Sequence, residues 1–195
     1  ADFKDEDAIM RLAEKSDVLT YEIELANSAA LKTLEARRYP VRPAPETLHI
    51  VQNKFRQKSF LRQHKIDVAD FERVRSEDHL YQLCDSFDFP VMLKACENSY
   101  DGRGNFLITS REQVSKAFNY FPGNELMVEK FVPFTKEISI MVARNPSGEV
   151  ASFPFVASSR VLMTAASVTF AISAASRPSM NARVLDASKV RIRSM

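Results

Sequence analysis

The chain contains no tryptophan, only two cysteines and four glycines among its 195 residues, and no long hydrophobic run. Two isolated cysteines are too few for a disulfide framework or a cysteine-based zinc site, and they indicate a reducing compartment, so we expect a cytoplasmic protein. No apolar run approaches the roughly 18 residues that a membrane helix needs. The net charge of +2 is too small to indicate a nucleic-acid or anionic-membrane partner.

Catalytic and metal-binding patterns built on histidine are also missing. The three histidines, His49, His64 and His79, are scattered, and none has metal-ligand spacing with cysteines or carboxylates. No Ser-His-Asp or Cys-His arrangement is readable, so nucleophilic hydrolase chemistry has no support. The N-terminus lacks an initiator methionine and a signal-peptide pattern, and we expect the chain to be a fragment.

The first forty residues alternate between helix and strand signals. Asp5 to Leu12 has apolar residues at helical spacing, Asp17 to Ile23 is rich in strand-forming residues, and Asn27 is a good N-cap for a second helix. This order is typical of the end of a parallel α/β sheet. Residues 40–45 then hold three prolines, which disfavour regular structure and predict a domain boundary.

Beyond that boundary the patterns predict a layered α+β domain. The expected elements are a helix over Glu46–His64, a helix over Ser76–Phe87 capped by Ser76, strands over Val91–Cys96 and Phe106–Ile108, a helix opened by a Ser110–Gln113 capping box, and strands over Glu125–Phe131, Glu137–Ala143 and Glu149–Val156. A good turn sequence at 145–148 joins the last two strands. After Val156 alanine and serine dominate, and the apolar residues lose any clean period.

Two of the four glycines fall in the sequence YDGRGN at 100–105, between two expected strands. Glycine permits close backbone approach, and successive N–H groups can line a concavity that holds phosphate. Arg103 could add a charged donor. Asp-Gly between two apolar runs is also a hairpin signal, and one loop can serve both purposes.

Lys94 lies inside the apolar strand before this loop, where an ammonium costs several kcal/mol unless it finds an anion. Alternation of side chains puts it on the face of Met92 and Cys96, opposite Val91 and Leu93. The loop follows six residues later, so lysine and loop can converge on one phosphate chain. The alternative is a lysine at the strand edge that extends its ammonium to solvent.

Two carboxylates complete the candidate site. Glu129 lies in the apolar run 126–132, and Glu137 begins the next expected strand. A strand that ends in a backbone hinge can hydrogen-bond the edge of an adenine, and a nearby carboxylate can hold ribose hydroxyls. Taken singly, each carboxylate is more simply explained as a surface residue.

Four segments resemble the ATP-dependent subunit of phosphoribosylaminoimidazole carboxylase, also called N5-carboxyaminoimidazole ribonucleotide synthase, an ATP-grasp enzyme of de novo purine synthesis. They are DVLTYEIE (17–24), PAPETLHIVQNKFRQKSFLRQHKI (43–66), FPVMLKACENSYDGRGNF (89–106) and VEKFVPFTKEISIMVAR (128–144). The similarity runs in order from residue 1 to about residue 155 and is closer to the fused eukaryotic enzyme. The resemblance implies an α/β (α+β) fold, with the end of a Rossmann-like pre-ATP-grasp domain at 1–39 and a partial ATP-grasp domain at 40–195.

The resemblance also implies the reaction and its small-molecule partners. ATP and bicarbonate would form carboxyphosphate, whose carboxyl then moves to the amine of aminoimidazole ribonucleotide. Phosphoryl transfer of this kind requires positioning and charge neutralisation, which lysines, a glycine loop and Mg²⁺ can supply. The resemblance implies a carboxylase of the ligase or lyase class. It is also compatible with a homo-oligomer and with a mutase domain fused to the same chain.

The site residues follow by position. The ATP-binding residues would be Lys54, Lys94, Ser99, Tyr100, Asp101, Gly102, Arg103, Gly104, Asn105, Glu129, Lys130, Phe131, Val132 and Glu137, with the adenine at 129–132 and the ribose at Glu137. The ribonucleotide substrate would contact Glu24, Tyr100, Asp101 and Arg103.

Some features depart from the family pattern. Residues 156–178 match poorly, and Arg160 stands where the family has a histidine near the nucleotide. The metal-binding carboxylates are expected beyond the C-terminus, so we expect no metal site in this chain and no complete reaction from it alone. Two alternatives remain open: another ATP-grasp carboxylate–amine ligase, since the fold hosts many acceptors, and a non-catalytic nucleotide-binding domain.

Overall fold

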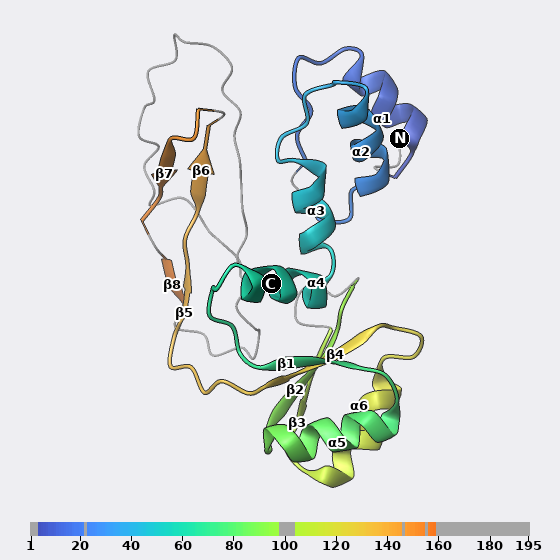
Figure 1. The fold of residues 1–195 in the computed structure, drawn as a ribbon, viewed down its shortest axis with the longest axis vertical. Helices are drawn as coiled ribbons and strands as arrows, with labels where there is room; N and C mark the ends of the chain where they lie inside the picture. Colours follow the sequence, from blue (N-terminus) through green and yellow to red (C-terminus); the bar gives the residue numbers. More distant parts are fainter. Residues whose placement is uncertain (1–3, 22, 98–103, 146, 155, 159–195) are drawn as a thin grey trace. The chain divides into compact units, whose positions relative to one another are not determined.

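The computed structural model of the chain describes residues 4–21, 23–97, 104–145, 147–154 and 156–158 (Figure 1). The chain divides into two compact units, of which one is residues 50–134 and the other comprises the flanking residues. No helix in the described part is long and apolar enough to span a membrane.

The first two helices form as the sequence predicts. Helix α1 is Glu6–Ala13 and helix α2 is Ser28–Ala36. Their N-caps are Asp5 and Asn27, and each side-chain oxygen accepts a 3.0 Å hydrogen bond from the backbone N–H three residues later. The short polar caps therefore fix where both helices begin.

The strand expected over 17–23 is wrong. Leu19 instead makes an isolated parallel bridge to Val41, flanked by backbone hydrogen bonds of 2.8 and 2.9 Å. A strand requires a ladder of partners, and in the described part of this segment only Leu19 finds one. The proline-rich residues 40–45 are packed at this point, because Val41 is 1% exposed. The domain boundary predicted there stays a prediction.

The single helix expected over 46–64 is two helices. Helix α3 is Pro45–Val51 and helix α4 is Lys54–Gln63. Between them Asn53 adopts an extended conformation (φ −124°, ψ 116°), and its Oδ1 accepts a 3.0 Å hydrogen bond from the N–H of Arg56. The helical spacing of apolar residues continues from α3 into α4. The spacing alone therefore predicts one helix and does not indicate the N-cap at Asn53.

A four-stranded antiparallel sheet organises residues 50–134. Its strands, in spatial order, are β1 (Phe71–Val74), β4 (Leu126–Lys130), β2 (Val91–Ala95) and β3 (Asn105–Ile108). The strands predicted before and after the glycine loop are confirmed, as is the strand predicted over 125–131. The sequence did not predict strand β1, because FERV lacks the alternation of apolar and polar residues that is typical of a half-buried strand.

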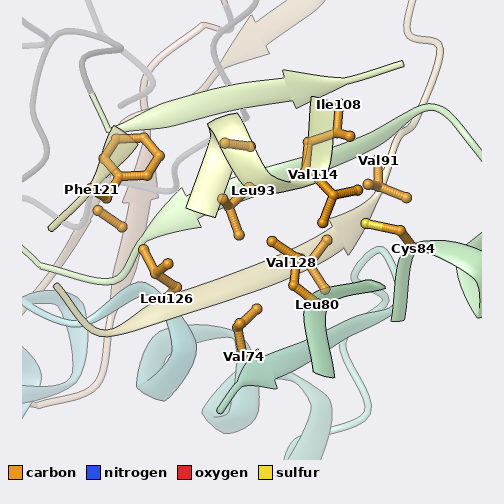
Figure 2. Close-up of a cluster of buried hydrophobic side chains, with 12 residues drawn as sticks. Val74, Leu80, Cys84, Val91, Leu93, Ile108, Val114, Phe121, Leu126 and Val128 are labelled. Carbon is orange, nitrogen blue, oxygen red and sulfur yellow. The ribbon is translucent and has the colours of Figure 1, made fainter. Parts of the chain in front are cut away.

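Two helices cover one face of this sheet (Figure 1). Helix α5 is Glu77–Phe87, capped by Ser76 as predicted, and helix α6 is Val114–Tyr120. Figure 2 shows the core between helices and sheet, where the labelled side chains are Val74, Leu80, Cys84, Val91, Leu93, Ile108, Val114, Phe121, Leu126 and Val128. Close packing of this layer makes the sheet a rigid support for groups on its other face.

The predicted capping box before α6 is wrong. A 3-10 turn, η1 (Arg111–Gln113), precedes the helix, and Ser110 makes no side-chain capping bond. The Oε1 of Gln113 instead accepts hydrogen bonds from the N–H (2.9 Å) and the hydroxyl (3.1 Å) of Thr109. In a capping box Gln113 would bond to the N–H of Ser110. After the tighter 3-10 turn its side chain bonds to Thr109 instead, one residue earlier in the chain.

The strands predicted after residue 136 form, but each is divided into two. Strand β5 (Glu137–Ser139) pairs with β8 (Val156–Ser158), and β6 (Val142–Arg144) pairs with β7 (Val150–Ser152), both antiparallel. The break between β7 and β8 contains Pro154, which has no N–H to continue a ladder, and the break between β5 and β6 lies at residues 140–141.

Candidate nucleotide-binding site

The second face of the four-stranded sheet carries charged residues among apolar ones. Glu129 on β4 lies opposite Phe71 on β1 and Met92 on β2, and Lys94 on β2 lies opposite Met127 on β4. Lys94 and Glu129 are therefore diagonal neighbours on one face, within reach of each other's long side chains. The predicted orientation of Lys94, on the face of Met92, is confirmed.

Two lysines converge on one carboxylate at this point. The Nζ of Lys94 lies 2.5 Å from Oε1 of Glu129, and the Nζ of Lys58, on α4, lies 2.6 Å from Oε2. Lys94 is 2% exposed and Glu129 is 7% exposed. The three side chains together carry a formal charge of +1, and Lys58, at 19% exposed, is the least buried of them.

The pKa shifts of the group have distinct causes. Burial lowers the pKa of Lys94, and Lys58 adds to the lowering, while the Glu129 carboxylate opposes both. Burial alone raises the pKa of Glu129, but the charges of Lys94 and Lys58 outweigh it and leave the pKa lowered. The carboxylate is thus held ionised, and the buried lysine is the member whose charged form is penalised.

Aromatic contacts fix α4 over this face of the sheet. Phe55 packs edge-on against Phe71 with ring centroids 5.4 Å apart, and the guanidinium carbon of Arg62 lies 3.8 Å from the centroid of the same ring. An Arg62 nitrogen also donates a 3.0 Å hydrogen bond to the carbonyl of Phe71. Lys58 lies between these two contacts along the helix, so its position over the sheet is set on both sides.

Backbone hydrogen bonds fix the base of the glycine loop. The N–H of Lys54 donates to the carbonyl of Cys96 (2.8 Å), and the N–H of Ala95 donates to the carbonyl of Gly104 (2.9 Å). The N–H of Cys96 donates to the carbonyl of Glu125 (2.8 Å). The start of α4, both ends of the loop and the start of β4 are therefore joined at one place.

Asn53 reinforces this junction with its side chain. The amide nitrogen donates to Oε1 of Glu97 (3.0 Å) and to Oε2 of Glu125 (2.9 Å), while the amide oxygen caps α4. Asn53 is 2% exposed. Arg73 pairs with the other oxygen of Glu125 at 2.9 Å. One buried amide thus ties the helix that carries two lysines to the base of the loop.

Asn105 lies directly opposite Lys94, on β3. Its Oδ1 is buried and has no hydrogen-bond partner within the described residues. A buried oxygen in this condition is costly unless a ligand or water satisfies it. This acceptor therefore adds a polar group beside the excess positive charge.

Two family models match the sequence. The model of the ATP-grasp domain matches residues 59–181, more than half of the chain, and the model of the ribonucleotide synthetase preATP-grasp domain matches residues 1–52. The chain belongs to the ATP-grasp family. The family resemblance and the α/β (α+β) class read from the sequence are both confirmed.

Named relatives make the match more specific. The ATP-grasp chain is 38% identical over 158 residues to phosphoribosylaminoimidazole carboxylase of Candida albicans, covering 79% of this chain and 28% of that protein. A structure of carboxyaminoimidazole ribonucleotide synthase from Aspergillus clavatus complexed with ATP is similar at 32% identity with a TM-score of 0.75, covering 80% of this chain and 41% of that one. A second Aspergillus clavatus structure, of the synthase with ADP and 5-aminoimidazole ribonucleotide, has 28% identity and a TM-score of 0.73, covering 80% of this chain and 40% of that one. The chain thus spans well under half the length of these relatives.

The predicted site residues of the ATP-grasp chain fall into three groups. Lys54, Lys94, Gly104, Asn105 and Glu129 lie on the sheet face or at the base of the loop. Residues Ser99, Tyr100, Asp101, Gly102 and Arg103 lie outside the described residues. The others are Lys130, exposed at the end of β4; Phe131, half-buried; Val132, 52% exposed; Glu137 in β5, whose backbone pairs with Ser158 in β8; and Glu24, half-buried in the N-terminal segment.

Sequence reasoning missed two residues of this site, Lys58 and Asn53. Lys58 follows Lys54 by one helical turn, so helical periodicity could have placed both on one face of α4. The cap at Asn53 could have been read from an Asn that precedes a run of helix-forming residues. In the described part of the chain, no group of three or more His, Cys, Asp or Glu side chains is placed to hold a metal ion.

Proposed function

We propose that this chain carries the ATP-binding part of a phosphoribosylaminoimidazole carboxylase of purine biosynthesis. Membership of the ATP-grasp family and the names of relatives at 28–38% identity support the proposal. The observation that carries it is the buried charge on the sheet face, where two ammonium groups share one carboxylate beside the base of a glycine loop. A buried excess of positive charge favours an anion, and the phosphates of ATP are the anion that this family uses.

Each residue group has a proposed role. Lys94 and Lys54 would contact the phosphates, and the loop 99–105 would cover them. The segment 129–132 would hold the adenine, and Glu137 the ribose. Because both oxygens of Glu129 are engaged by lysines, the adenine contacts of this segment would come from its backbone. Glu24 and the loop side chains would contact the ribonucleotide.

The chemistry follows from this placement. An oxygen of bicarbonate would attack the γ-phosphorus of ATP, and ADP would leave, which gives carboxyphosphate. The amine of aminoimidazole ribonucleotide would then attack the carboxyl carbon, and inorganic phosphate would leave. Lys94 and Lys54 would neutralise the charge that develops on the phosphate oxygens.

The resemblance also implies Mg²⁺, which would add charge neutralisation at the phosphates. The described residues do not fit such a site, because they contain no cluster of three metal-ligating side chains. We therefore assign no step to the metal in this part of the chain. The domain boundary near residue 40, the ligase or lyase class, a fused mutase domain and a homo-oligomer belong to the same proposal for the whole protein.

ATP consumption by the full-length gene product tests the proposed function. We expect ADP to form only when bicarbonate or aminoimidazole ribonucleotide is present. ADP formation that depends on a different amine acceptor would identify another ATP-grasp ligase. ATP binding without turnover under any of these conditions would identify a non-catalytic nucleotide-binding domain.

A further inference from the structure

We propose that Lys58 is a positioning residue of the nucleotide site. It keeps the Glu129 carboxylate compensated, so that Lys94 can leave that carboxylate and bind a phosphate group. This role of Lys58 rests on the proposed binding of ATP, and the family resemblance assigned no role to Lys58.

The geometry separates the two lysines. Lys58 reaches Glu129 from helix α4 at Oε2, and Lys94 reaches it from strand β2 at Oε1. Neither ammonium has to move for the other to keep its own oxygen. The Nζ of Lys58 lies 2.6 Å from Oε2, within ion-pair distance. The Lys58 contact at Oε2 is therefore separate from the Lys94 contact at Oε1.

The energetics give Lys58 its role. If Lys94 exchanges Glu129 for a phosphate, it keeps a counter-ion, but Glu129 loses one. Glu129 is 7% exposed, and an ionised carboxylate that is buried without a partner is strongly unfavourable. With Lys58 in place, Glu129 retains one ammonium throughout. Without Lys58, ATP would have to compete with Glu129 for the single remaining lysine.

The surroundings of Lys58 suit a fixed counter-ion. Its side chain is 19% exposed, so it keeps some hydration, whereas Lys94 is nearly inaccessible. Its Nζ lies 5.7 Å from the centroid of the Phe71 ring, which adds a weak attraction for the charge. Burial and the neighbouring Lys58 charge both lower the pKa of Lys94. A phosphate at Lys94 would thus relieve the repulsion between the two ammonium groups.

The test compares three ligands in calorimetric titrations at neutral pH: ATP, inorganic tripolyphosphate and adenosine. We expect Lys58→Met to weaken the binding of ATP and tripolyphosphate by about tenfold or more and to leave the affinity for adenosine within about twofold. Lys58→Arg keeps the charge and should restore most of the loss. In the Lys58→Met background, Glu129→Gln removes the competing carboxylate and should recover ATP affinity.

Each outcome has a meaning. Equal loss of ATP and adenosine affinity in Lys58→Met, with no recovery in the double variant, would show a purely structural ion pair and overturn the inference. Unchanged ATP affinity in Lys58→Met would also overturn it, while the proposed function would stand. If the unsubstituted chain binds neither ATP nor tripolyphosphate, the ATP-binding proposal fails together with the inference. Urea denaturation of each variant checks that it is folded.

Discussion

The ammonium of Lys94 lies 2.5 Å from the carboxylate of Glu129 on one face of the sheet, and a second ammonium, that of Lys58, lies 2.6 Å from the other oxygen of the same carboxylate. The arrangement is asymmetric. Glu129 has two counter-ions, whereas each lysine has one shared carboxylate. Removing different members of the group should therefore have different effects.

The first prediction concerns stability. Lys94→Met leaves Glu129 paired with Lys58, so we expect a change in the free energy of unfolding of about 1 kcal/mol or less. Glu129→Met leaves Lys94 buried beside a like charge, and we expect a loss of about 3 kcal/mol or more. Urea denaturation of both variants measures the difference. Equal losses in the two variants would contradict the asymmetry.

The second prediction concerns pH. Burial lowers the pKa of Lys94, so the folded chain loses this proton at a lower pH than the unfolded chain does. Between the two pKa values the unfolded state binds more protons, and the contribution of Lys94 to stability rises with pH. Phosphate binding needs the charged form, so ATP affinity should fall as the pH rises through the lowered pKa, below the ordinary lysine value of about 10.4.

Titrations with ATP between neutral and alkaline pH measure this effect. In Lys94→Met the affinity should be weaker and nearly independent of pH over the same range. A decline of equal size in that variant would assign the effect to another group.

Much of this architecture could be predicted from the sequence, because local signals decide it. The caps at Asn27 and Ser76 are set by neighbouring residues, and the strands on either side of the glycine loop follow from their apolar runs. The orientation of Lys94 follows from strand alternation. These features depend on only a few adjacent residues.

Three features that the sequence did not predict correctly depend on residues distant in sequence. The segment around Leu19 has strand-forming residues, but pairing decides whether a strand forms. Strand β1 exists because β4 pairs with it, although its own sequence does not alternate. The ion pair between Lys58 and Glu129 joins residues 71 positions apart in the sequence, and no local pattern predicts this contact.

The third prediction concerns Asn53, which both caps α4 and donates to Glu97 and Glu125. Asn53→Ala removes both functions, and Asn53→Ser retains a capping oxygen. We expect Asn53→Ala to lower the free energy of unfolding by about 1 kcal/mol more than Asn53→Ser does. Thermal or urea denaturation provides the measurement. Equal stability of the two variants would show that the cap contributes little.

The fourth prediction concerns the two thiols. Both are buried, and burial raises the pKa of Cys84 to about 11 and that of Cys96 to about 12. Since the thiolate is the reactive form, both should resist a disulfide reagent at pH 8 in the folded chain. In urea two thiols should react quickly. Rapid reaction of either thiol without denaturant would contradict the packing around it.

The fifth prediction tests the central claim, that the buried Lys94 is where this chain holds the phosphates of ATP. Calorimetric titration of the chain with ATP gives the affinity, which we expect to fall by about a hundredfold in Lys94→Met, in line with the loss of a charge-assisted contact in a buried site. Lys15→Met removes the same charge from an exposed position and should leave the affinity within about twofold. The same affinity in Lys94→Met as in the unsubstituted chain would contradict the account.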